Sequence, residues 1–118
     1  MKLKIILSSL IIGVFALFGT GKVLAADIVN LYLFWGDGCP HCAKEKEFLN
    51  KLVKEDKDII LHSYEVYKDD VGRAKLMEAS KKLGVDINGV PFLIVGDKYV
   101  TGYMNEETTG KEIERLIK

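Results

Sequence analysis

Apolar and polar positions along residues 28–117 predict alternating strands and helices. Residues 28–35 form a continuous apolar, β-rich run, which is typical of a strand buried on both faces. A helix is expected from Cys39-Pro40, because proline is favoured in a first helical turn. Its apolar stripe recurs at helical spacing: Phe48, Leu49, Leu52 and Val53. Its other positions are charged and predict a solvated face: Lys44, Glu45, Lys46, Glu47, Lys51 and Lys54.

The remaining elements predict the fold class. They are a strand over 59–66, a helix over 70–83, strands over 92–95 and 98–101, and a last helix containing Ile113, Leu116 and Ile117. Gly84 suits the end of the second helix, and Gly96-Asp97 suits a hairpin turn. Thr109 and Glu112 fit a capping box for the last helix. The order βαβαββα predicts an α/β domain whose central mixed sheet is flanked by helices.

Residues 1–25 follow a different pattern, typical of an export signal. Lys2 and Lys4 precede an apolar run over 5–18, which has the length of a signal-peptide core and is short for a membrane span. The small residue Ala25 predicts cleavage after it. An uncleaved N-terminal anchor is the main alternative, and a buried structural helix fits less well. Signal and anchor both place the single domain, 26–118, outside the cytoplasm, where disulfides persist.

Composition and charge exclude several classes of protein. The 118 residues include 17 Lys+Arg and 17 Asp+Glu, so the formal charge is zero. Lys2, Lys4 and Lys22 belong to the export segment, which leaves 14 basic and 17 acidic residues in the domain. A near-neutral domain without a basic run argues against nucleic-acid binding. Nothing in the sequence requires more than a monomer.

The candidate chemistry lies at Cys39-Pro40-His41-Cys42, which holds both cysteines of the chain. The motif follows a buried strand and begins a helix, so the two sulfurs can alternate between dithiol and disulfide. Cys39 should be the exposed and reactive cysteine, since free N–H groups and the positive helix end favour its thiolate. Cys42 should be more buried and should resolve the mixed disulfide that Cys39 forms.

Two neighbouring residues should adjust the reactivity of Cys39 in opposite directions. His41 can offer a hydrogen bond or partial positive charge to the thiolate, which makes the disulfide a stronger oxidant. Asp37 lies two residues before Cys39 and disfavours the thiolate. The sequence does not rank these two effects. The qualitative expectation is that the Cys39–Cys42 disulfide acts as an oxidant.

Other interpretations of the cysteines and histidines fit the sequence less well. A purely structural disulfide would close too small a loop to stabilise the fold much. A metal site could combine the cysteines with His41, His62 or a carboxylate, but zinc sites usually show a second ligand pair. We therefore expect no metal, and no cofactor besides the redox-active pair. His62 should be packed or on the surface. Four tyrosines are expected in sheet packing: Tyr64, Tyr67, Tyr99 and Tyr103.

Two segments resemble the thioredoxin superfamily of thiol–disulfide oxidoreductases. Phe34-Trp35-Gly36-Asp37-Gly38-Cys39-Pro40-His41-Cys42 is similar to the superfamily's active-site pattern, and Cys-Pro-His-Cys is the tetrapeptide of exported DsbA dithiol oxidases. Gly89-Val90-Pro91 resembles the superfamily's cis-proline segment. The resemblance covers residues 28–117 and implies a minimal thioredoxin-like fold.

The resemblance also implies the roles of individual residues. Cys39 and Cys42 would perform the exchange, aided by Pro40 and His41. Three residues would bind substrate: Trp35, Val90 and Pro91. The implied partners are protein thiols or disulfides and a separate redox protein that resets the cysteine pair. Dithiol oxidation is favoured, with an exported reductase or a non-enzymatic metal-binding thiol protein as alternatives.

The chain departs from these relatives at three points. It is too short for the helical insertion of DsbA proteins, and it lacks the N-terminal β–α unit of thioredoxins, so its size is glutaredoxin-like. Leu33 occupies the position where the superfamily often has a buried carboxylate, six residues before the first cysteine. Proton transfer to Cys42 would therefore need another base or water.

Overall fold

The computed structural model describes Gly21 and residues 27–118. Eight elements follow in order: β1 (Val29–Trp35), α1 (Pro40–Glu55), β2 (Ile59–Glu65), α2 (Asp70–Leu83), β3 (Phe92–Val95), β4 (Lys98–Thr101), the π-helical turn η2 (Glu106–Gly110) and α3 (Lys111–Ile117). No helix in these residues has the length and apolar character needed to cross a membrane. Apart from Gly21, the predicted export signal and its cleavage site lie outside the described residues.

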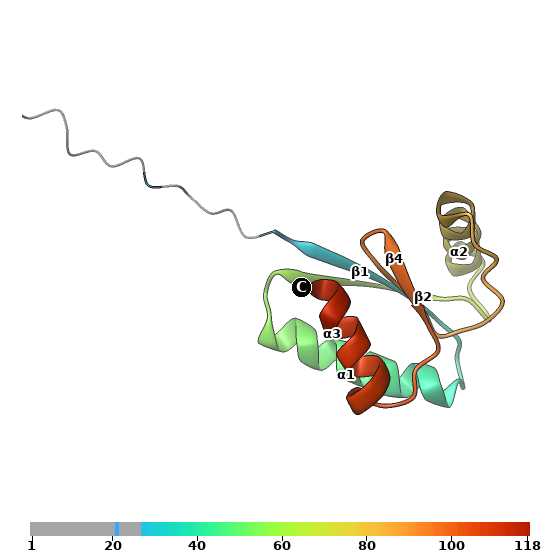
Figure 1. Cartoon of the computed structure of the whole chain (residues 1–118). Helices are drawn as coiled ribbons and strands as arrows, with labels where there is room; N and C mark the ends of the chain where they lie inside the picture. Colours follow the sequence, from blue (N-terminus) through green and yellow to red (C-terminus); the bar gives the residue numbers. More distant parts are fainter. Residues whose placement is uncertain (1–20, 22–26) are drawn as a thin grey trace, which may run out of the picture.

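The four strands form one mixed sheet in the order β2-β1-β3-β4. β1 runs parallel to β2 and antiparallel to β3, and β3 pairs antiparallel with β4. Figure 1 shows α1 and α3 against one face of this sheet and α2 against the other. The expected α/β architecture with a mixed sheet between helices is confirmed.

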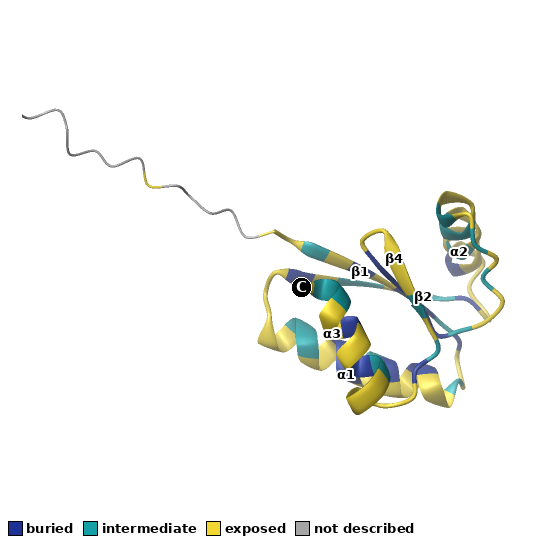
Figure 2. Ribbon diagram, in the orientation of Figure 1, coloured by how far each residue is buried: buried dark blue, intermediate teal, exposed yellow. Residues whose placement is uncertain are grey.

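The larger core lies between the sheet and the α1–α3 pair. Leu31 and Leu33 point from β1 to this side and are fully buried, as are Leu49 of α1 and Ile113 of α3. The buried positions of α1 appear in Figure 2 as dark bands along the helix side that meets the sheet and α3. The apolar stripe predicted for this helix therefore anchors it beneath the sheet.

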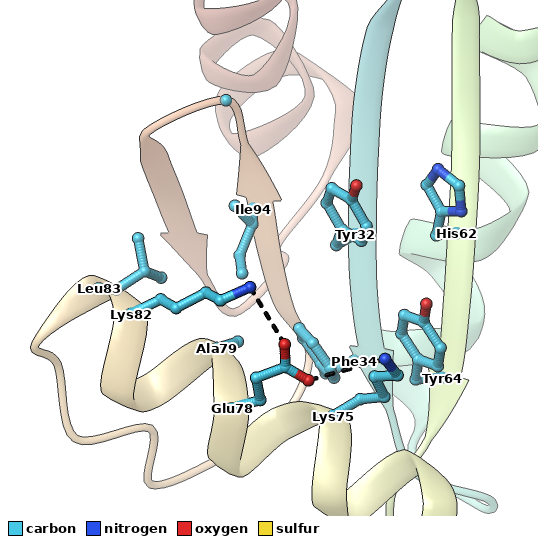
Figure 3. A pocket seen from close by; sticks show the side chains of 11 residues that line it. Tyr32, Phe34, His62, Tyr64, Lys75, Glu78, Ala79, Lys82, Leu83 and Ile94 are labelled. Atoms are coloured by element: carbon cyan, nitrogen blue, oxygen red, sulfur yellow. Dashed lines mark ion pairs between the residues drawn. The ribbon is translucent and has the colours of Figure 1, made fainter.

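The opposite face of β1 is only partly covered. Phe34 is buried under α2, whereas Tyr32 and Asn30 are exposed, so the expectation that 28–35 is buried on both faces is wrong at these two positions. α2 packs over the C-terminal end of β1 and leaves a hollow of about 510 Å³ beside it. Figure 3 shows Tyr32 and His62 on strands that border this hollow. His62 stacks on Tyr32 and pairs with the Asn30 side chain.

The tyrosines divide between sheet and loops. Tyr64 and Tyr99 stack on Phe34 and Phe92, as expected of sheet residues. The same expectation is wrong for two others, which lie outside the strands. Tyr67 is exposed in the loop before α2, and Tyr103 follows β4 and enters the larger core.

The start of the last helix also differs from its prediction. Asn105 caps the η2 turn by accepting the N–H of Thr108 at 2.9 Å. Thr109 lies inside that turn and accepts the N–H of Met104 instead of capping α3. The predicted Thr109–Glu112 capping box is therefore wrong, because the helical turn begins four residues earlier than predicted and Asn105 supplies its cap.

Candidate active site

Cys39 and Cys42 form a disulfide at the start of α1. Cys39 is the N-cap residue, with extended backbone, and it is half-buried, whereas Cys42 is only 1% exposed. The backbone N–H of Cys42 points at Cys39 Sγ at 3.2 Å. Pro40 occupies the first turn and is exposed. One sulfur is thus partly accessible and receives an N–H donor, while its partner lies inside the protein.

Two glycines shape the loop that carries Cys39. Gly38 has φ +81°, a conformation that residues with a Cβ rarely adopt. Gly36 is buried under the Tyr67 ring, which occupies the space where a Cβ would lie. The Gly36 carbonyl accepts the Cys39 N–H at 3.1 Å. The Gly36-Asp37-Gly38 segment is therefore a tight turn, and the Tyr67 ring packs directly against Gly36.

Glu65 ties this loop to the segment that follows β2. Its carboxylate accepts backbone N–H bonds from Asp37, Tyr67, Lys68 and Asp69 at 2.6–3.3 Å. Partial burial acts to raise the pKa of Glu65, and the N–H donors together outweigh it, so that the pKa is lowered. Sequence reasoning missed this residue, since a glutamate at a strand end carries no distinctive motif.

The charge of Asp37 is balanced by Lys68. The two side chains pair at 2.5 Å, and the hydrogen bond and charge of Lys68 lower the pKa of Asp37. Asp37 was expected to oppose the Cys39 thiolate. Lys68, distant in sequence, offsets that effect by placing a positive charge beside the carboxylate.

His41 is held by a backbone carbonyl. Its Nδ1 lies 3.0 Å from the carbonyl oxygen of Tyr103, which can only accept, so the bond requires the proton on Nδ1. Nε2 is then the nitrogen left for other interactions. No hydrogen bond joins His41 to Cys39 among the described residues in this disulfide form.

Val90 and Pro91 lie at the same end of the sheet as the cysteines. Phe92 pairs with Phe34, which places Pro91 beside the C-terminal end of β1. The Val90–Pro91 peptide bond is cis, and Pro91 is buried while Val90 is half-buried. The Pro91 carbonyl accepts the N–H of Gly102 at 2.8 Å, one residue before the Tyr103 that holds His41. The fold thus brings the two predicted segments together.

Trp35 borders a groove next to the disulfide. The groove, of about 310 Å³, is also lined by Cys39, Pro40 and Lys46. The Lys46 ammonium lies 3.4 Å from the centre of the Trp35 ring, a cation–π contact that keeps the half-buried indole in place. Trp35 therefore forms part of the wall of the groove beside Cys39.

Glu45 contradicts the expected solvated face of α1. Its exposed fraction is 0%, and neither carboxyl oxygen has a hydrogen-bond partner in the described part of the chain. Burial raises the pKa of Glu45 from 4.5 to about 8. The charged run around it resembles a surface, but its spacing, three residues after Cys42 and four before Leu49, places it on the buried stripe. That spacing is the signal that could have identified it.

The arrangement is suited to thiol–disulfide exchange. One accessible sulfur can be attacked or can attack, and the second can be released or can return. No group of three histidine, cysteine, aspartate or glutamate side chains forms a candidate metal site in residues 27–118.

Comparison with known proteins places this site in a family. The glutaredoxin family model matches residues 29–100. Glutaredoxin 1 of Salmonella typhimurium is 30% identical over 80 residues, covering 68% of this chain and 88% of that protein. A probable thioredoxin of Archaeoglobus fulgidus is 30% identical over 91 residues, covering 77% of this chain and 91% of that protein.

A solved structure supports the same fold. A thioredoxin variant from Halobacterium salinarum NRC-1 superposes with a TM-score of 0.54 at 22% identity, covering 78% of this chain and 77% of that one. Glutaredoxins and thioredoxins are thiol–disulfide oxidoreductases that act on thiols or disulfides through such a cysteine pair. The chain, with its Cys39–Cys42 disulfide on a thioredoxin-like sheet, belongs to the glutaredoxin family of these enzymes.

Proposed function

We propose that this glutaredoxin-family enzyme oxidises protein dithiols outside the cytoplasm. The observation that carries the proposal is the position of Cys39 at the N-cap of α1, where its sulfur receives the N–H of Cys42. A donor and the positive helix end both stabilise a thiolate at Cys39. A stabilised thiolate favours the reduced enzyme, so the disulfide gains oxidising power. The Lys68 charge beside Asp37 acts in the same direction.

The proposed reaction transfers two electrons to the cysteine pair. A substrate thiolate attacks Cys39 Sγ, the Cys39–Cys42 bond breaks, and Cys42 leaves. A second substrate thiolate then attacks the substrate sulfur of the mixed disulfide, and Cys39 leaves as a thiolate. The substrate gains a disulfide, and the reduced enzyme is reoxidised by a separate redox partner.

The reduction potential tests the direction of transfer. Equilibration of Cys39 and Cys42 with glutathione mixtures should give a potential above about −200 mV, toward the DsbA value of about −120 mV. A potential near the thioredoxin value of about −270 mV would replace this proposal by that of an exported reductase. Replacing His41 by serine should lower the potential, because the imidazole that favours the Cys39 thiolate is then missing.

The extracytoplasmic location rests on the N-terminal sequence. Lys2 and Lys4 followed by the apolar run 5–18 are typical of an export signal. Fractionation of cells that express the full chain, with the intact mass of the product, tests this location. A product beginning at Ala26 supports cleaved export, and a full-length membrane-bound product supports an anchor. A full-length cytoplasmic product would contradict both.

Substrate docking is proposed at Trp35, Val90 and Pro91. All three lie at the cysteine end of the sheet, and Trp35 borders the groove beside Cys39. Replacing Trp35 by leucine should raise the KM for a reduced peptide substrate and leave the reduction potential nearly unchanged. An unaltered KM would remove Trp35 from the binding surface.

A further inference from the structure

The strongest unexplained feature of the molecule is a buried carboxyl group. Among residues 27–118, Glu45 is the only ionisable acidic or basic residue that is buried, and both of its carboxyl oxygens lack a hydrogen-bond partner there. An isolated buried carboxylate is costly unless it is neutralised or has a functional use. No group among residues 27–118 forms a hydrogen bond that compensates for burying this carboxyl, and a role in the chemistry of the site would explain its position.

Glu45 lies one helical turn beyond the buried cysteine. Cys42 and Glu45 are three residues apart on α1, and both face the protein interior. Side chains at this spacing are neighbours on a helix, with Cβ atoms about 5–6 Å apart. A glutamate side chain can therefore reach the Cys42 sulfur directly or through one water molecule.

We infer that Glu45 is the proton donor and acceptor for Cys42. It supplies from α1 the carboxyl group that Leu33 does not supply from β1. Leu33 is fully buried in the apolar core and has no proton to exchange. The assignment rests on thiol–disulfide exchange in either direction, and it does not depend on whether the enzyme oxidises or reduces in the cell.

The proton balance is the same in both directions. When a substrate thiolate attacks Cys39, the S–S bond breaks and Cys42 leaves as a thiolate; the Glu45 carboxyl gives it a proton and becomes a carboxylate. In the reverse step the Glu45 carboxylate takes the proton of the Cys42 thiol. The new thiolate then attacks Cys39 Sγ and expels the substrate thiolate. Only the proton moves between the two side chains.

The surroundings of Glu45 support this exchange near neutral pH. From the loop after β4, Tyr103 faces α1; burial, with nearby Glu106 and Glu45, raises its pKa to about 12, so it stays neutral. Glu106 of η2 pairs with Lys51. The larger core around them otherwise contributes apolar side chains. A pKa of about 8 for Glu45 keeps most of the carboxyl groups protonated at pH 7, while a minor fraction is present as the carboxylate.

The test separates the two steps of one reaction. Reduced protein is mixed with excess 5,5′-dithiobis(2-nitrobenzoate) in a stopped-flow instrument: attack by Cys39 releases the first thionitrobenzoate and attack by Cys42 releases the second. In the unmodified protein the second rate constant should rise with pH and level off near pH 8. In Glu45→Gln it should fall at least about tenfold at pH 7 and lose that inflection. The first rate constant should stay within about twofold.

A control variant identifies what a failure means. Glu47→Gln makes the same glutamate-to-glutamine substitution at an exposed position of α1 and should match the unmodified protein in both steps. A Glu45→Gln profile that coincides with the unmodified one would overturn the assignment. This kinetic result is independent of the reduction potential, which tests the direction of electron transfer.

A measurement on the unmodified protein covers the case in which the variant fails to fold. The carboxyl ¹³C resonance of Glu45 should titrate near pH 8 in the oxidised protein, and its midpoint should move when the disulfide is reduced, because the Cys42 sulfur then carries a titrating proton. A midpoint near 4.5, or one unaffected by reduction, would contradict the exchange.

Discussion

Replacing Glu45 by glutamine should change how the stability of the oxidised protein depends on pH. The pKa of this carboxyl is raised by burial from 4.5 to about 8. A raised folded-state pKa means that the protonated form is stabilising: its contribution is complete below about pH 4.5 and is lost as the pH rises toward 8. The unmodified protein should therefore lose stability over this range, and the neutral amide should remove that loss.

The size of the effect follows from the pKa gap. One pKa unit corresponds to 1.36 kcal/mol, so a shift from 4.5 to about 8 corresponds to about 5 kcal/mol in total. Between pH 5 and pH 8 the Glu45 contribution should fall by about 3–4 kcal/mol. The amide has its own cost of burial, but that cost does not change with pH and cancels when two pH values are compared.

Urea unfolding followed by circular dichroism measures this difference. The free energy of unfolding of oxidised Glu45→Gln minus that of the unmodified protein should rise by about 3–4 kcal/mol from pH 5 to pH 8. Carboxyl groups with lowered pKa, such as those of Asp37 and Glu65, are present in both proteins and cancel. Glu47→Gln should show almost no change. A Glu45→Gln difference that stays constant within about 1 kcal/mol would refute the reasoning, since the buried carboxyl would then titrate normally.

Three further predictions concern the cysteines, the loop charge and the core. Cys39→Ala should abolish exchange and Cys42→Ala should accumulate mixed disulfides, which non-reducing electrophoresis detects; full activity of Cys39→Ala would contradict the site. Lys68→Ala should raise the thiol pKa of Cys39, measured by thiolate absorbance, because Asp37 loses its counter-charge; an unchanged or lower pKa would contradict the offset. Ile113→Ala should lower the free energy of unfolding by about 2–5 kcal/mol, measured in urea, since Ile113 is fully buried; a loss below about 1 kcal/mol would contradict its place in the core.

Local patterns predicted most of the fold and the centre of the site. The apolar run of β1, the Cys39-Pro40 start of α1 and the Gly84 end of α2 depend on neighbouring residues, and these elements formed where expected. The cysteine pair could be predicted equally well from the sequence, because its spacing fixes both sulfurs in one helical turn. The wrong capping box at Thr109 shows the limit of a local rule, since Asn105 offered a cap earlier in the chain.

Pairings between distant residues decided the rest. Glu65 fastens the cysteine loop and Lys68 neutralises Asp37 only because the parallel pairing of β1 and β2 brings their ends together. The burial of Glu45 depends on how the sheet, α3 and Tyr103 close around one side of α1. The sequence by itself determined the fold class and the two reacting sulfurs, through local periodicity and spacing. Tertiary packing alone decided the charges and protons around them, because a side chain's pKa depends on what the whole fold places beside it.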